Sequence, residues 1–227
     1  MITQEEREVL LKILCEYRSK EEAAKELNLP VESVNERFES GIEKQLRYLN
    51  RAKKASSIDV YIASPFGRAI ERNEYYFDPK GFDINIEISD KIESMGYTTF
   101  SPAYFIAEVK YKGKLDTIML RKCRSIYAVM TRFSFGTIEE VTEMHMMGKP
   151  VVIYATKNDI YNNINGHTRR FCHYIAPKDF DISFKCLEDA LTGKEEFEYI
   201  REERALFNDY VVLKKCKRCG SSEPLVI

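Results

Sequence analysis

The chain has 227 residues, a hydrophobic fraction of 44% and a formal net charge of -1. This length and composition are those of a folded protein with one good-sized domain and a small accessory part. The balanced charge gives no overall attraction to nucleic acid or to anionic membranes. The N-terminus lacks an apolar signal core and no run reaches membrane-spanning length, so we expect a cytoplasmic protein without a membrane partner.

Residues 1–50 have the pattern of a small all-α module. Apolar residues recur at helical spacing in 9–14, and a capping box at Ser19 and Glu22 predicts a second helix. The segment resembles the helix-turn-helix of sigma-factor region 4 and of LuxR-type regulators. Its candidate recognition helix, residues 31–46, carries four glutamates against two basic residues, which suits a phosphate backbone poorly. DNA binding and a packing or dimerisation role are therefore both open.

Strand patterns alternate with helix patterns after a polar segment, residues 51–57, which we interpret as a linker. The alternation predicts an α/β domain over residues 58–191 with a flavodoxin-like, doubly wound parallel sheet of order 2-1-3-4-5. In such a sheet, ligands bind at the carboxyl ends of the first and third strands, where the winding reverses. The expected strands are 59–63, 97–101, 125–131, 151–155 and 170–175, and the expected helices are 83–95, 114–123, 137–147 and 179–191.

Both strands at this switch point are followed by residues suited to a ligand. Ser64, Gly67 and Arg68 follow the first strand and offer a hydroxyl, a flexible backbone and a guanidinium, which suit an anionic oxygen such as phosphate. The run Ser-Phe-Gly-Thr-Ile-Glu-Glu, residues 134–140, follows the third strand. Its Gly136 gives a ligand access to backbone N–H groups, and a glutamate there can attack an electron-poor carbon. No Walker loop or dinucleotide fingerprint supports ATP hydrolysis or hydride transfer.

Residues 192–227 form a C-terminal extension. Their pattern predicts a charged helix over 195–207 and a short strand over 210–213. The six cysteines of the chain are expected to be reduced thiols, since no secretion signal accompanies them. Cys216 and Cys219 have the spacing of metal ligands. They belong either to a reduced tail or to a structural zinc site, and no other cofactor is expected. Candidates to complete a tetrahedral set are Cys172, His173 and Cys186.

Residues 58–155 resemble the nucleoside 2-deoxyribosyltransferase superfamily. The resemblance rests on four features in order: a small-residue loop after the first strand, Asp116 in the helix before the third strand, the run Gly-Thr-Ile-Glu-Glu at 136–140, and Gly-Lys-Pro at 148–150 before a strand. Each feature is weak alone, but a chance α/β protein rarely supplies all four in this spacing.

The resemblance implies the roles of two acids. Glu140, and not its neighbour Glu139, corresponds to the nucleophile that attacks the anomeric carbon, and Asp116 corresponds to the acid that organises the site near sugar and base. Glu139 and Glu143 are expected on a solvated helix face. From the residues alone, Glu140 also fits a structural interpretation, as a carboxylate favoured by the helix dipole.

The residue at position 134 separates two branches of this superfamily. Transferases acting on free nucleosides commonly carry Asp there, whereas relatives that hydrolyse nucleoside 5′-monophosphates carry Ser, as this chain does. A hydroxyl removes repulsion toward a 5′-phosphate and adds a donor. The resemblance therefore implies that Ser64, Arg68 and Ser134 form one phosphate pocket; a β-strand cap and a surface arginine remain the structural alternative.

The leading hypothesis is an N-glycosidase that releases the base from a nucleoside 5′-monophosphate through Glu140. Alternatives are base exchange between deoxynucleosides, a non-catalytic nucleotide-responsive DNA-binding regulator and, more distantly, a TIR-like NAD glycohydrolase. Sites in the superfamily are often completed by a neighbouring subunit. The resemblance thus implies a homodimer or larger assembly, with Asn163 in the loop 158–167 as a candidate substrate contact.

Overall fold

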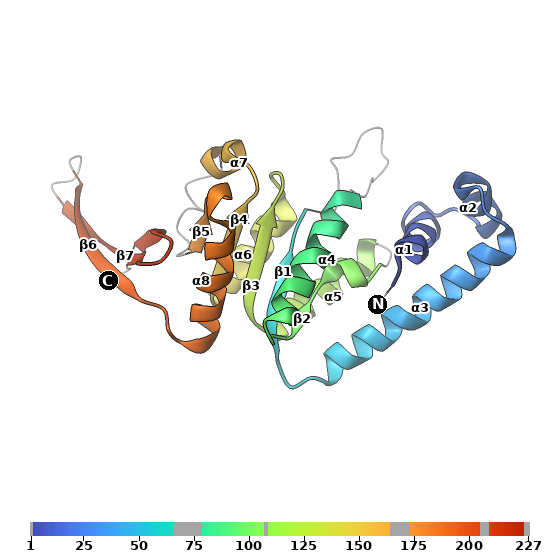
Figure 1. The fold of residues 1–227 in the computed structure, drawn as a ribbon, viewed down its shortest axis with the longest axis horizontal. Coiled ribbons are helices and arrows are strands. Elements are labelled where there is room, and N and C mark those ends of the chain that lie inside the picture. The colour runs from blue at the N-terminus through green and yellow to red at the C-terminus, as the bar shows by residue number, and fades with distance from the viewer. Residues whose placement is uncertain (1, 66–78, 107–108, 164–172, 205–208, 225–227) are drawn as a thin grey trace.

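The computed structural model describes residues 2–65, 79–106, 109–163, 173–204 and 209–224. Helices at the N-terminus, a central α/β layer and a small C-terminal antiparallel sheet follow one another along the long axis of the molecule (Figure 1). The predicted residues Gly67 and Arg68 lie outside the described part of the chain, as does Cys172.

The N-terminal part is helical, as predicted. It comprises α1 (Gln4–Leu10), a π-helical segment (Leu11–Cys15), α2 (Lys20–Leu27) and α3 (Val31–Lys54). The predicted capping box is present, because Ser19 accepts a hydrogen bond from the backbone of Glu22 and the Glu22 side chain accepts one from Ser19 N–H. Asn28 ends α2 in the left-handed conformation, with φ of 53°.

Helix α3 continues into the core of the α/β domain, so the predicted linker 51–57 is wrong at its start. Tyr48, Leu49 and Ala52 of α3 belong to the same buried cluster as the sheet. Tyr48 Oη also accepts a hydrogen bond of 2.7 Å from the backbone N–H of Ser101. The polar composition of 51–54 reflects the exposed side of a helix whose other side is buried.

The central sheet has five parallel strands in the order β2-β1-β3-β4-β5, which confirms the predicted fold class. Adjacent strands are in register with Ala63 opposite Ala128 and Val152 opposite His173. The inner strands are buried on both faces and therefore appear as continuous apolar runs. The strands are β1 (Ile58–Ala63), β2 (Thr99–Phe100), β3 (Cys123–Met130), β4 (Val151–Ala155) and β5 (His173–Ile175).

Helices cover both faces of this sheet (Figure 1). The four helices predicted between residues 83 and 191 are all present, with their ends shifted by up to five residues. Met119 and Val141, from α5 and α6, pack on one face, whereas Ile92 and Leu187, from α4 and α8, pack on the other. The bounds are α4 (Pro79–Ser94), α5 (Val109–Lys122), α6 (Phe135–Met146), α7 (Asn158–Asn163) and α8 (Phe180–Thr192), with 3-10 turns at Pro102–Tyr104 and Pro177–Asp179.

The C-terminal extension forms an antiparallel sheet of β6 (Phe197–Arg204), β7 (Asp209–Cys216) and β8 (Ser222–Pro224). The helix predicted over 195–207 is therefore wrong, and the predicted strand 210–213 is too short. Strand pairing with β7 overrides the helical preference of the charged residues in β6. Cross-strand contacts reinforce it, since the Arg201 guanidinium lies 3.6 Å from the ring centroid of Tyr210.

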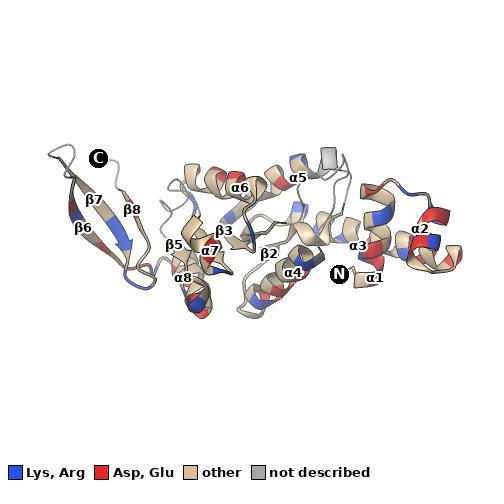
Figure 2. Ribbon diagram, turned by 90° about the horizontal axis from the view of Figure 1, so that it is seen from above, with Lys and Arg blue, Asp and Glu red and all other residues tan. Residues whose placement is uncertain are grey.

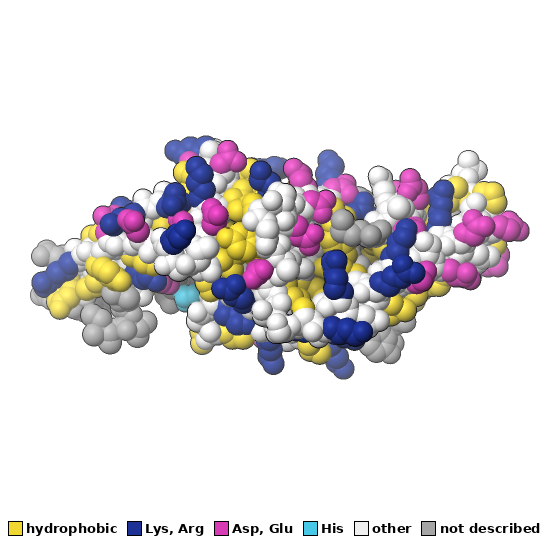
Figure 3. All heavy atoms as spheres, turned by 60° about the horizontal axis from the view of Figure 1, so that its bottom comes forward, with side chains coloured by type: hydrophobic (Ala, Val, Ile, Leu, Met, Phe, Trp, Pro, Cys, Tyr) yellow, Lys and Arg dark blue, Asp and Glu magenta, His cyan; other side chains and the backbone are white. Residues whose placement is uncertain are grey.

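Charges of both signs are interspersed along the N-terminal helices (Figure 2) and over the face shown in Figure 3. Within the described ranges, no helix combines the length and the apolarity that crossing a membrane requires. The mixed pattern agrees with the near-zero net charge of the sequence.

Candidate active site and metal cluster

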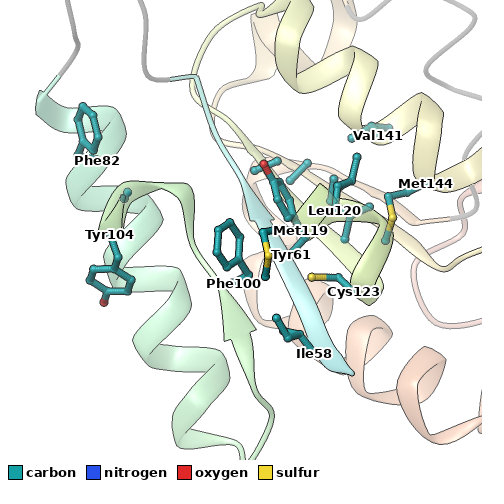
Figure 4. Packing of buried hydrophobic residues seen from close by; sticks show 14 of the residues in the cluster. Ile58, Tyr61, Phe82, Phe100, Tyr104, Met119, Leu120, Cys123, Val141 and Met144 are labelled. Atoms are coloured by element: carbon teal, nitrogen blue, oxygen red, sulfur yellow. The ribbon is translucent and has the colours of Figure 1, made fainter. Parts of the chain in front are cut away.

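The hydroxyl of Tyr61 on β1 meets the carboxylate of Glu140 on α6. Tyr61 Oη donates a hydrogen bond of 2.8 Å to Glu140 Oε1, and the tyrosine is fully buried. Figure 4 shows Tyr61 between Phe100 and the helix that carries Val141 and Met144. The contact links strand β1 to α6, the helix that follows the neighbouring strand β3. It therefore fixes the position of Glu140 relative to the sheet.

The negative charge of Asp116 on α5 also acts on the Tyr61 hydroxyl. The pKa of Tyr61 is raised well above its ordinary value, first by burial and then by the negative charges of Glu140 and Asp116. The phenol therefore stays protonated and acts as a donor to the glutamate. The two predicted acids thus both act on Tyr61, a residue that was not among the predicted site residues.

Ser134 caps the start of α6, the helix that carries Glu140. It is the N-cap residue, with extended backbone angles, and its Oγ accepts a hydrogen bond of 3.4 Å from Thr137 N–H. Gly136 lies in the first turn, and among the described residues outside its own stretch of helix no atom lies within 4 Å of the position that a Cβ would occupy. The start of α6 is therefore open on this side, although the Ser134 hydroxyl already serves as a cap.

The neighbouring glutamates differ from Glu140. Glu139 is exposed, as expected for a solvated helix face. Glu143 is partly buried and forms an ion pair of 2.7 Å with Arg121 on α5. Of the three, Glu140 is the one held by the buried Tyr61 hydroxyl.

Ser64, directly after β1, has a structural role in the described part of the chain. The residue is 4% exposed, and its hydroxyl donates to the carbonyl of Gly81 at 3.1 Å and accepts from Asn85 Nδ2 at 3.1 Å. Asn85 is fully buried and also donates to the carbonyl of Ile62. This network fixes the end of β1, which is the structural alternative considered for Ser64.

A second feature at the carboxyl ends of β3 and β4 is a cavity of about 300 Å³. Its lining includes the cations Arg132 and Lys157, the carboxylate of Asp159 and the predicted residue Asn163. Asn163 is the last residue of α7, so the predicted loop 158–167 begins as a helix. Arg132 and Lys157 were not among the predicted site residues, although positions shortly after two parallel strands are typical of ligand contacts.

A cluster of metal-ligand types lies elsewhere, where the C-terminal sheet meets the α/β domain. One ligand atom from each of His173, Cys186, Cys216 and Cys219 lies within 4.8 Å of all the others. Two of the three candidates predicted to complete the Cys216 and Cys219 pair are therefore present. This buried cluster could hold a metal ion.

No protein-family model matches the chain, and no curated protein matches it. Among solved structures, a 2-deoxyribosyltransferase from Bacillus psychrosaccharolyticus is 18% identical, with a TM-score of 0.40, over 52% of this chain and 84% of that one. The response regulator PhyR from Brucella abortus is 15% identical, with a TM-score of 0.36, over 85% of this chain and 69% of that one. PhyR from Bartonella quintana is 14% identical, with the same TM-score, over 85% and 67%. Similarities at this level concern the general fold and assign no activity.

Proposed function

We propose that this protein is an N-glycosidase that releases the base from a nucleoside 5′-monophosphate, with Glu140 as the nucleophile. The observation that carries the proposal is the contact between Glu140 and Tyr61 at the switch point of the sheet, with Asp116 nearby. Two carboxylates around a buried hydrogen-bond donor, at the ligand-binding edge of a parallel sheet, suit chemistry at an anomeric carbon.

The proposed reaction has two steps. A carboxylate oxygen of Glu140 bonds to C1′ while the C1′–N bond breaks, and the base leaves with the electron pair of that bond and takes up a proton. Water then attacks C1′ and releases Glu140, giving free base and sugar 5-phosphate. Asp116 is the group proposed to handle the proton and to orient sugar and base.

Tyr61 acts as a positioning residue in this scheme. Its protonated hydroxyl occupies one lone pair of Oε1, which holds the carboxyl group in one orientation and favours its ionised form. The ionised form is the one that can attack carbon.

An anionic substrate is supported by the side chains at the same edge of the sheet. Arg132 and Lys157 line the cavity beside β3 and β4. Ser134 uses its oxygen as an acceptor in the helix cap and keeps its O–H as a donor. We propose that these residues and Arg68 act on the 5′-phosphate, with Ser64 shaping the loop through its hydrogen bonds to Gly81 and Asn85.

The test is incubation of the purified protein with nucleoside monophosphates, nucleosides and NAD, followed by chromatography of free base. Base and sugar 5-phosphate from a monophosphate support the proposal. Transfer of the sugar to an added second base would instead make the protein a base-exchanging transferase that uses the same Glu140. No base release from any substrate would contradict both enzymatic functions and favour a binding protein.

Tyr61→Phe is expected to lower kcat about tenfold, because a hydrogen bond to a charged group contributes roughly 1.5–3 kcal/mol and only part of it acts in the transition state. The acidic limb of the pH–rate profile should move to higher pH, since the carboxylate loses a donor that favours its charged form. Tyr48→Phe is the matched control, as Tyr48 is a buried tyrosine bonded to the Ser101 backbone. An unchanged pH profile in Tyr61→Phe would contradict the positioning role.

We expect the protein to be a homodimer or a larger assembly. Large apolar side chains are exposed on α5, on α6 and directly before and after α6: Ile118, Phe133, Phe135, Met146 and Met147. Met146, 80% exposed, is the most exposed of them, and such a surface is typical of an interface. Sedimentation should give at least twice the chain mass, and Met146→Lys should favour monomers, whereas Leu46→Lys on α3 should not. A monomeric, fully active wild type would contradict this expectation.

A further inference from the structure

We propose that His173, Cys186, Cys216 and Cys219 bind one Zn²⁺ ion in a closed structural site, which fastens the C-terminal sheet to the α/β domain. The four residues come from separate parts of the fold. His173 begins β5, Cys186 lies on α8, Cys216 ends β7, and Cys219 follows in the turn before β8.

The geometry of the cluster matches a tetrahedral ion. Zinc bonds of about 2.3 Å to sulfur and 2.0–2.1 Å to nitrogen place neighbouring ligand atoms roughly 3.5–3.8 Å apart. All four ligand atoms already lie within 4.8 Å of one another, and the distance from Cys219 Sγ to His173 Nδ1 is 3.6 Å. Only small side-chain adjustments separate this arrangement from a coordinated one.

The chemistry of the donors selects zinc. Three thiols and one imidazole are the ligand set of structural zinc sites, whereas Mg²⁺ and Ca²⁺ prefer oxygen. His173, Cys186 and Cys216 are at most 3% exposed, and Cys219 is partly buried. Four protein ligands fill a tetrahedral shell and leave no position for a reacting water molecule.

A second side chain orients the imidazole. His173 Nε2 lies 2.5 Å from Glu195 Oε1, and the carboxylate accepts a hydrogen bond from Nε2–H. The tautomer with its proton on Nε2 leaves the lone pair of Nδ1 directed at the cysteines. Histidine ligands of zinc commonly have such a carboxylate on the other nitrogen.

The turn that contains Cys216 and Cys219 holds their two sulfur atoms close together. Gly220 N–H donates to the Cys216 carbonyl at 2.8 Å, and Cys216 N–H donates to the Ser221 carbonyl at 2.8 Å. Gly220 has φ of 74°, a conformation that a side chain would strain. Such a turn brings two ligands together before the metal binds.

The position of the cluster assigns it a structural role. His173 is the first residue of β5 and pairs with Val152, at the amino end of the parallel sheet. Glu140 belongs to a different part of the domain, since it lies on α6, which follows the carboxyl end of β3, and contacts Tyr61 on β1. Around the cluster, Ser221 Oγ bonds to the backbone of Tyr174 on β5, and Arg218 pairs with Asp189 on α8. The ion would sit where these contacts between the C-terminal sheet and the α/β domain converge.

The full-length protein, produced with zinc in the medium and purified without chelators, is the material for the test. Elemental analysis should find about one zinc ion per chain, and Cys219→Ser should lose most of it. Cys15→Ala, which removes a buried thiol far along the chain, should keep it. Cobalt substitution should give the intense visible absorption of a tetrahedral thiolate site.

A milder variant tests the site even if Cys219→Ser misfolds. Glu195→Gln keeps all four ligands and should weaken zinc affinity about 10–100-fold in competition with a chelator. Chelation of the wild type should also expose the segment 193–224 to proteolysis while base release persists. Two results would overturn the proposal. One is a zinc content below about a tenth of an ion per chain after the reduced protein has been incubated with zinc; the other is an undiminished zinc content in Cys219→Ser.

Discussion

Glu140→Gln is expected to lower the rate of base release by at least about 10³-fold, because an amide cannot form the covalent glycosyl intermediate. The fold should survive. Glutamine keeps the size of the side chain and an oxygen that can accept the hydrogen bond from Tyr61. Base release measured by chromatography and thermal unfolding measured by circular dichroism together separate loss of chemistry from loss of structure.

The matched control is Glu139→Gln, one position earlier on α6. Glu139 is exposed, so its substitution should change turnover less than about twofold, as surface changes usually do. An equal loss of base release in the two variants would indicate that both disturb helix α6, and not that one carboxylate performs the chemistry. Full activity of Glu140→Gln would end the assignment of the nucleophile.

Much of the fold could be predicted from the sequence because local patterns and layer packing agree. Short continuous apolar runs such as 151–155 are typical of strands buried on both faces, and the alternation with helices leaves few topologies. The C-terminal sheet could not be predicted in this way. Charged residues such as Glu198, Glu202 and Glu203 favour a helix locally, and only pairing with β7, a tertiary effect, selects the strand.

The candidate site was predictable in part, for a related physical reason. Glu140 and Asp116 lie in local motifs, whereas the role of Tyr61 depends on how β1 and α6 meet. A tyrosine in an apolar strand looks the same whether its hydroxyl contacts a carboxylate or a backbone group. The metal cluster shows the same limit, since the spacing of Cys216 and Cys219 is local but their distance to His173 is set by the fold.

Replacing Ser134 by Asp tests the phosphate assignment most sharply. Aspartate caps helices as well as serine does, so α6 should keep its start and only the charge should change. A negative charge beside the proposed phosphate should lower kcat/KM for the nucleoside 5′-monophosphate by at least about 100-fold, since it replaces an attraction by a repulsion. Turnover of the unphosphorylated nucleoside should be spared or improved.

Three further variants complete this experiment. Ser134→Asn is the neutral control, because asparagine also caps helices and adds no charge, and it should retain most of the preference for the monophosphate. Arg68→Ala should erase most of that preference, as a charge-assisted contact contributes about 1.5–3 kcal/mol, or some tenfold to hundredfold. If Lys157→Ala erases it instead, the phosphate binds in the cavity beside β4. Equal turnover of nucleoside and nucleotide by the wild type would rule out a phosphate pocket and favour the base-exchange reaction.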